Sequence, residues 1–214
     1  MKNMRLNNQV TVIGQVVSPF QYDHEMHHEK FYTLMLSVAR ASGQEDVLPV
    51  TISERLLDPT KDYQGSHMTI KGEFRSFDRP EELGWPKKKL FVFAQEVYEE
   101  SIWHPFMNNE VILHGFICKE PQHRTTPNNR EITDILMAVN LDYGKTDYIP
   151  CIAWGRTARW AGKLPVGTEL KVFGRIQSRD YKKILEDGTA EIRTAYEVSI
   201  SKIEEVRDGK STTK

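Results

Sequence analysis

The sequence has few of the features that mark secreted, membrane-spanning or disulfide-bonded proteins. Its only two cysteines, Cys118 and Cys151, lie in apolar strand-like patterns, so we expect buried, reduced thiols. No apolar run approaches the roughly 20 residues that a membrane-spanning helix needs, and we expect no membrane partner. The N-terminus lacks an apolar core followed by a small-residue cleavage site, which predicts no secretory signal and a cytoplasmic location.

Motifs of catalysis and of metal or cofactor binding are also missing. The triplet Gly209-Lys210-Ser211 has no partner glycine upstream, so it does not predict a phosphate-binding loop. His24 and His28 are four residues apart but lie in a predicted loop, without a nearby cysteine to complete a tetrahedral zinc site. We therefore predict no enzyme activity, no cofactor and no metal site.

The net charge of −1 does not by itself predict a polyanionic partner. Acidic residues outnumber basic ones in residues 1–106, whereas basic residues are slightly in excess in residues 107–214. Because phosphate binding depends on where cations cluster, the second half is the better candidate for it.

Three sequence blocks recur in the same order about 100 residues apart, which indicates an internal duplication. The pairs are Asn7–Gly14 with Asn108–Gly115, Met68–Phe77 with Leu170–Arg179, and Leu90–Val97 with Tyr196–Ile203. A period this long is typical of small domains and not of solenoid repeats. We predict domains at residues 1–103 and 108–206, joined near Pro105, and a disordered tail at residues 207–214.

Alternating apolar and polar residues predict five strands in each repeat. They lie at residues 9–17, 29–40, 46–52, 66–77 and 88–99, and at residues 109–118, 131–141, 146–153, 168–179 and 190–203. A short helix is predicted between the third and fourth strands, at Glu54–Leu57 and at Arg156–Gly162. This order is the plan of the OB-fold, so we predict an all-β protein of two tandem five-stranded Greek-key barrels.

Glycines and long connections add detail to this plan. Glycines interrupt the strand patterns at four places, where we expect bends or bulges that leave no room for a side chain. These are Gly14, Gly72, Gly115 and Gly174. Residues 21–30 and 121–130 are predicted loops, and residues 182–190 a hairpin closed at Asp187-Gly188.

Aromatic residues and arginines are interleaved between Thr146 and Tyr181. The aromatics are Tyr148, Trp154 and Tyr181, and the arginines are Arg156, Arg159, Arg175 and Arg179. Rings can stack on unpaired bases while guanidinium groups hold phosphates. From these residues alone, the alternative that Tyr148 and Trp154 are core residues beside a solvated basic face stays open.

A series of segments in the second repeat carries a family resemblance. In order, they are Asn109–Gly115, Pro121–Arg124, Ile132–Asn140, Tyr148–Gly155 and Val166–Arg179. The series resembles the bacterial single-stranded DNA-binding protein family, and the first repeat looks like a diverged copy. The resemblance implies sequence-independent binding of single-stranded DNA in replication, recombination or repair, and a homodimer that presents four OB domains.

The resemblance also implies roles for individual residues. It implies base stacking on Tyr143, Tyr148, Trp154 and Tyr181, and phosphate contacts from Arg124, Arg175 and Arg179. We add Arg156 from the basic–aromatic stretch, and Arg75 and Phe77 as residues through which the first repeat could bind DNA.

Two departures from the family pattern keep other functions open. The first repeat has no aromatic where Trp154 stands in the second, since the aligned segment is Val50-Thr51-Ile52-Ser53-Glu54. The chain ends in a short stretch that is not acidic, so recruitment of partner enzymes by an acidic tail is not implied. A structural or adaptor protein built on non-binding OB domains, and an RNA-binding OB module, are the alternatives.

Overall fold

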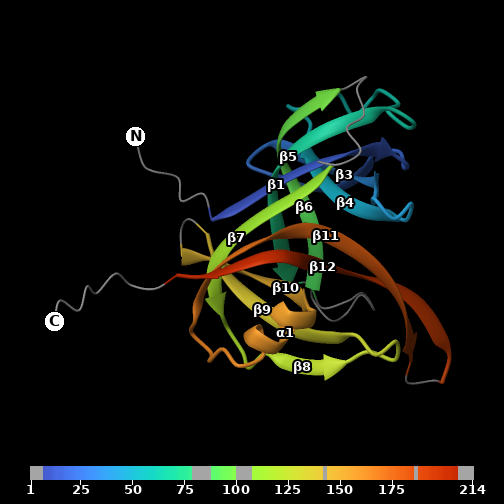
Figure 1. Ribbon diagram of the computed structural model, residues 1–214. Helices are drawn as coiled ribbons and strands as arrows, with labels where there is room; N and C mark the ends of the chain where they lie inside the picture. The colour runs from blue at the N-terminus through green and yellow to red at the C-terminus, as the bar shows by residue number, and fades with distance from the viewer. Residues whose placement is uncertain (1–6, 79–87, 100–107, 142–143, 186–187, 207–214) are drawn as a thin grey trace.

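Strands dominate the computed structural model, which describes residues 7–78, 88–99, 108–141, 144–185 and 188–206 (Figure 1). The elements are β1 (Asn8–Val16), β2 (Gln21–Met26), β3 (Glu29–Ala39), β4 (Glu45–Ser53), β5 (His67–Asp78), β6 (Lys88–Glu99), β7 (Asn109–Ile117), β8 (Gln122–Thr125), β9 (Glu131–Asn140), β10 (Thr146–Trp154), α1 (Gly155–Ala161), β11 (Glu169–Ile184) and β12 (Ala190–Glu205). Within this part of the chain, no helix has the length and apolar character to span a bilayer.

Two closed barrels follow one another along the chain. In the first, β1 pairs with both β3 and β5, and a parallel pairing of β4 with β6 completes the ring. In the second, β7 pairs with both β9 and β11, and β10 runs parallel to β12. The predicted all-β architecture of two tandem OB-fold barrels is confirmed.

Each barrel is filled by the apolar residues that alternate along its strands. Leu36 and Ile70 are fully buried in the first barrel, as are Leu113 and Ile149 in the second. Since successive side chains of a strand point to opposite faces, this alternation leaves the intervening residues on the outer surface. The outward positions of β10 therefore carry Tyr148 and Trp154, which are respectively exposed and half-buried.

Each barrel has a sixth strand where a loop was predicted. The segment of residues 21–30 contains β2, which pairs with β3 through a turn at His27 and His28, whose φ angles are 52° and 61°. β8 likewise pairs with β9, and Asn129 in the connecting turn has a φ of 56°. All residues of β2 and β8 are exposed, so neither strand has the apolar alternation that would reveal it.

The helix predicted at Glu54–Leu57 is wrong, because the structure has a turn there. Pro59 disfavours helical geometry at the residue before it, Asp58. Only the four residues 54–57 therefore remain for a helix. In the second barrel, α1 lies against Thr133, whose hydroxyl donates to the Ala158 carbonyl at 2.7 Å. Tyr32 occupies the equivalent position in the first barrel, and its ring packs edge-on against Phe20, 5.9 Å between centroids.

The glycine predictions are confirmed by close backbone contacts. A Cβ atom on Gly174 would lie 2.3 Å from the Ser199 carbonyl oxygen, and one on Gly72 would lie 1.9 Å from that of Phe93. The strand register shifts beside both residues. Gly14 and Gly115 make equivalent close approaches, so all four glycines let neighbouring strands cross at short range.

The two cysteines are unpaired, and Cys151 lies in the core of the second barrel whereas Cys118 is only half-buried. Burial raises the pKa of both thiols above the ordinary value. A thiol with a raised pKa carries little thiolate and reacts slowly, so neither residue is suited to nucleophilic chemistry.

The barrels are joined along β1 and β7, which pair antiparallel with Val10 opposite Val111. This pairing places the repeated strands of both barrels in one twelve-stranded sheet (Figure 1). The predicted boundary around Pro105 and the predicted tail at residues 207–214 lie outside the described residues. The division at residues 103 and 108 therefore stays a prediction.

Substitution of Gly174 by alanine tests the strand crossing. We expect Gly174→Ala to lower the free energy of unfolding by roughly 1–3 kcal/mol, the usual cost of forcing extra atoms into a packed interior. Gly162→Ala is the control, because Gly162 has a φ of −65° and its nearest neighbour would lie 3.1 Å from the new Cβ. Urea denaturation of both variants measures the difference, and equal losses would contradict this account.

Candidate nucleic-acid interface

A groove of about 410 Å³ opens on the second barrel and is rich in arginine. Its lining residues are Arg40, Arg130, Trp154, Arg175, Gln177, Ser178, Arg179 and Ser199. Arg40 comes from the end of β3 in the first barrel, whereas the other residues belong to the second. Fixed positive charge thus surrounds one large flat ring, the combination that suits an unpaired nucleic-acid strand.

Trp154 is held in place at the end of β10. Its indole nitrogen donates a hydrogen bond to the Ser199 hydroxyl at 3.1 Å, and its backbone is in register with Ile132 of β9. The side chain is half-buried, so part of the ring surface faces the groove. Because the ring is already oriented, little conformational entropy is lost when a base stacks on it.

The groove continues along one face of β11. Arg175, Gln177 and Arg179 line the groove, and since side chains of a strand alternate, Tyr181 and Lys183 lie on the same face. From residue 175 to residue 183 this face extends roughly 26 Å at about 3.3 Å per residue.

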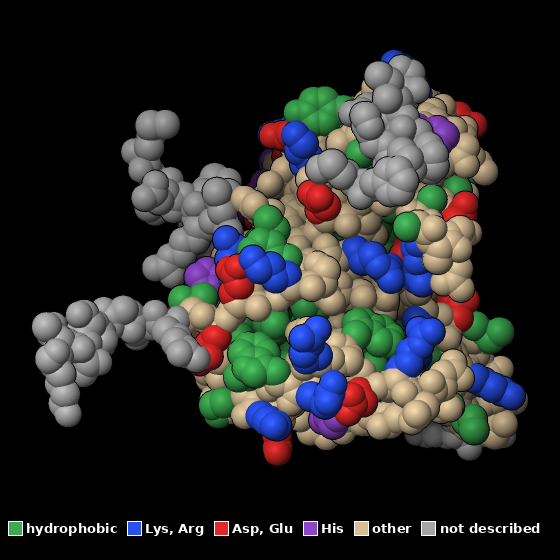
Figure 2. All heavy atoms as spheres, in the orientation of Figure 1, with side chains coloured by type: hydrophobic (Ala, Val, Ile, Leu, Met, Phe, Trp, Pro, Cys, Tyr) green, Lys and Arg blue, Asp and Glu red, His purple; other side chains and the backbone are tan. Residues whose placement is uncertain are grey.

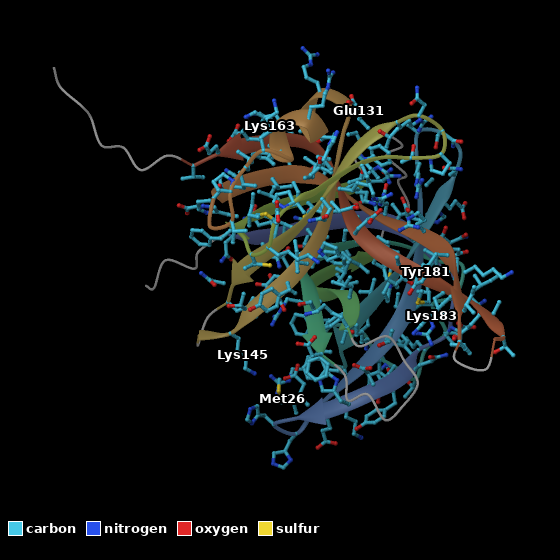
Figure 3. The ribbon with its side chains drawn as sticks, turned by 90° about the horizontal axis from the view of Figure 1, so that it is seen from below. Met26, Glu131, Lys145, Lys163, Tyr181 and Lys183 are labelled. Carbon is cyan, nitrogen blue, oxygen red and sulfur yellow. The ribbon has the colours of Figure 1, made fainter. Side chains whose placement is uncertain are left out.

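Tyr181 and Lys183 lie on a hairpin that projects from the barrel. β11 and β12 extend beyond the second barrel as a long ribbon (Figure 1), and both side chains come from this ribbon (Figure 3). Tyr181 is 36% exposed and stands opposite Arg193 of β12. The predicted hairpin between residues 182 and 190 is confirmed, although Asp187 of its predicted turn lies outside the described residues.

Charges in the groove do not cancel. Arg130 has no ionic partner among the described residues, and Arg179 is 4.0 Å from its nearest carboxylate, Glu197. Arg40 and Arg175 share a single carboxylate, the fully buried Asp46. Figure 2 shows, on one face of the molecule, Lys and Arg side chains interspersed with hydrophobic ones over the second barrel, the lower half of that view.

The two arginines that share Asp46 remain cations. Hydrogen bonding to Asp46 raises the pKa of Arg40, whereas burial lowers the pKa of Arg175. A guanidinium group stays protonated in proteins in either case. Two cations around one carboxylate leave a net positive charge at this end of the groove.

Tyr148 lies away from Trp154. The two residues are six positions apart on β10, roughly 20 Å along the strand. Tyr148 is 38% exposed, its ring lies 4.9 Å from the Lys88 ammonium, and its backbone N–H donates to the Ser76 hydroxyl at 2.9 Å. Tyr148 therefore stands beside β5 and β6 of the first barrel and outside the groove.

The remaining predicted residues do not line the groove. Arg75 donates to Asp147 of the second barrel at 2.6 Å, which places its guanidinium between the barrels. Arg124 donates to Asp134 at 2.6 Å, a bond that raises the pKa of Arg124. Phe77 is 60% exposed near the end of β5, and Arg156 is exposed in the first turn of α1. Tyr143 lies outside the described residues.

The equivalent face of the first barrel has glutamates at two positions where the groove has arginines. An offset of 101 residues relates Ser53 to Trp154 and Glu29 to Arg130. Between β5 and β11 the offset is 102, which relates Glu73 to Arg175. Glu29 accepts a hydrogen bond from Ser53, and Glu73 pairs with Arg75 at 3.1 Å.

Sequence reasoning missed Arg40 and Arg130. For Arg130 a signal was present, because alignment of the two repeats shows an acid replaced by arginine at that position. Nothing local marks Arg40, since its side chain reaches the groove only through the packing of one barrel on the other.

The fold and the groove define a tandem OB-fold protein with an arginine-rich groove beside an aromatic ring. The structure is similar over 97% of its length to the single-stranded DNA binding protein from Thermus aquaticus, with a TM-score of 0.72 and 22% identity, covering 96% of that chain. A deletion mutant of the same protein gives a TM-score of 0.71 with 96% and 98% of the two chains covered, again at 22% identity. At this identity the likeness establishes the shared fold.

Sequence comparison finds relatives of the second barrel. Residues 108–206 match the single-strand binding protein family. The single-stranded DNA-binding protein A of Bacillus subtilis is 35% identical over 83 residues, which are 36% of this chain and 48% of that protein. The match to the single-strand binding protein family thus lies in the second barrel. The chain spans about half the length of the curated relatives it matches.

Replacement of Arg75 tests whether that residue joins the barrels. Arg75→Gln leaves the carboxylate of Asp147, which is 2% exposed, without its cation, and breaking such a buried pair costs about 3 kcal/mol or more. We expect urea denaturation to show this loss, and the double variant Arg75→Gln with Asp147→Asn to recover part of it. Unchanged stability together with weaker DNA binding would instead make Arg75 a DNA contact.

Proposed function

We propose that the protein binds single-stranded DNA without sequence preference, in replication, recombination or repair. The observation that carries this proposal is the groove in which four arginines surround the half-buried ring of Trp154. The sequence relatives of the second barrel, single-stranded DNA-binding proteins of several bacteria, support the same assignment. The site of action is then the bacterial cytoplasm or nucleoid, and the protein itself is a binding protein and not an enzyme.

Base stacking supplies the first part of the proposed binding. Trp154 and Tyr181 are aromatic residues at two points along the groove face, and stacking on such rings is worth roughly 1–3 kcal/mol per base. Every base has a flat face, so this contact tolerates any sequence. Tyr148 stacks a further base only where the strand passes from the groove toward the first barrel.

Phosphate contacts supply the second part. Arg130 and Arg179 are the cations of the groove least compensated by carboxylates, and Lys183 extends the positive charge along the hairpin. Arg40 and Arg175 contribute although they share Asp46, because two guanidinium groups exceed one carboxylate. Arg124, Arg156 and Phe77 lie beyond the lining residues and serve, in this proposal, as outlying contacts. Tyr143 keeps the stacking role that the family resemblance implies.

Oligomeric state follows from the same proposal. Family members present several OB domains to one strand, and we propose that two copies of this chain form a homodimer with four barrels. Single-stranded DNA and a second copy of the chain are then its partners, with no membrane and no small-molecule substrate.

Removal of the Trp154 ring tests the stacking contact. We expect Trp154→Ala to weaken binding of oligo-dT by roughly 1–3 kcal/mol, the stacking energy of one base. Trp160→Ala is the matched control, because Trp160 is 39% exposed on α1 and does not line the groove. Fluorescence anisotropy of a labelled oligonucleotide measures both affinities. Equal affinities for the parent and the Trp154 variant would contradict the assignment of the groove.

Salt dependence tests the phosphate contacts. Each cation that neutralises a phosphate of a single strand steepens the fall of log K with log[salt] by about 0.7. We expect Arg179→Ala to reduce this slope by that amount, while Arg55→Ala, at an exposed arginine of the first barrel, leaves it unchanged. Titrations at several salt concentrations give the slopes. An unaltered slope in the Arg179 variant would remove this residue from the interface, and competition by oligo-U would detect a preference for RNA.

A further inference from the structure

We propose that the first barrel completes the DNA groove of the second: it supplies Arg40 as a cation and Asp46 as the residue that positions it. This inference rests on the proposed function and adds a division of labour between the two barrels. The first barrel takes part in binding chiefly through its contact with the second, and Phe77 remains only an outlying contact.

Asp46 is the centre of a hydrogen-bond cluster between the barrels. Its carboxylate is fully buried and accepts from Arg40 Nε at 2.7 Å and from Arg175 Nη1 at 2.9 Å. The Ser178 backbone N–H donates to it at 2.6 Å, and the Ser178 hydroxyl at 3.3 Å. One carboxylate of the first barrel thus holds two arginines and the backbone of β11 at Ser178.

Arg40 is held on every side of its guanidinium group. Besides its two bonds to Asp46, it donates to the Ser178 carbonyl at 3.2 Å and to the Gln44 side chain at 3.1 Å. Its side chain is 20% exposed, and the exposed part lines the groove. A guanidinium fixed in this way presents its charge at a defined place and loses little freedom when a phosphate arrives.

Without Asp46 the two guanidinium groups repel one another. Burial lowers the pKa of Arg175, and the nearby charge of Arg40 lowers it further, whereas the charge of Asp46 opposes both effects. Asparagine at position 46 keeps the shape of the side chain but has no charge to hold two cations. Arg40 and Arg175 would then separate, and the groove would lose its fixed geometry.

The duplication supplies a matched control at Asp147. This residue is 2% exposed and accepts from the Ser76 backbone N–H at 3.1 Å and from the Ser76 hydroxyl at 3.2 Å, as Asp46 does from Ser178. Its cation is Arg75. However, the first-barrel positions equivalent to Trp154 and Arg175 are Ser53 and Glu73, so the Asp147 cluster lacks counterparts of that ring and that arginine and is structural.

The direction in which Asp46→Asn changes DNA affinity distinguishes a positioning role of Asp46 from a simple effect of its charge. Asp46→Asn removes a negative charge beside a groove that binds a polyanion, so charge alone predicts tighter binding. Positioning predicts weaker binding, because the arginines lose the group that orients them. The two explanations therefore differ in direction and not only in size.

The test compares Asp46→Asn with Asp147→Asn in the full chain, by anisotropy of labelled oligo-dT, with thermal melts of both variants. We expect Asp46→Asn to weaken binding at least tenfold and Asp147→Asn to change it less than threefold, at similar losses of stability. Unchanged or tighter binding by Asp46→Asn, or equal weakening by both variants, would overturn the inference.

Arg40 gives an independent readout if Asp46→Asn does not fold. We expect Arg40→Gln to reduce the slope of log K against log[salt] by about 0.7, and Arg40→Lys to restore the slope but not the full affinity. An unchanged slope in Arg40→Gln would overturn the role of this residue. Failure of the parent chain to bind oligo-dT would refute the proposed function itself, whereas a binding parent with unaffected Arg40 and Asp46 variants would refute only this inference.

Discussion

The antiparallel pairing of β1 with β7 is the contact on which the rest of the structure depends. It places Val10 opposite Val111 and turns two barrels into one continuous sheet. This pairing fixes how the barrels face each other. Each barrel can therefore place a buried carboxylate against a strand of the other: Asp46 contacts β11 and Asp147 contacts β5. A groove lined by both barrels follows from this arrangement, since Arg40 reaches it only across the joint.

Duplication conserved the framework while the surfaces diverged. The strand crossings at Gly72 and Gly174 are equivalent, and so are the hydrogen bonds from Asn8 and Asn109 to the strands beside them. Such contacts determine how the strands close into a barrel, so a substitution at one of them affects the whole barrel. Surface positions are free of that constraint, so Glu29 in one barrel could become Arg130 in the other without cost to the core. The same scaffold thereby carries a basic groove on one barrel and, at equivalent positions of the other, glutamates paired with arginines.

Apolar periodicity and repeated glycines predicted the two barrels, because both signals depend on backbone geometry that any sequence in this fold must satisfy. The exposed strands β2 and β8 were missed because they bury no face and so show no alternation. Trp154 and Arg179 were predicted at the groove from the basic–aromatic pattern. The same pattern could not separate them from Arg75, whose charge is paired across the joint, nor detect Arg40, since a contact between barrels leaves no local mark in either segment.

The claim that the second barrel's groove holds the DNA is tested most directly by photocrosslinking. Oligo-dT with bromodeoxyuridine at several positions reacts on irradiation with aromatic side chains that stack on the substituted base, and mass spectrometry of the digested protein identifies the attached peptide. We predict crosslinks to the peptides that contain Trp154 and Tyr181. Crosslinks confined to the first barrel around Ser53 and Phe93, with none at Trp154, would contradict the account.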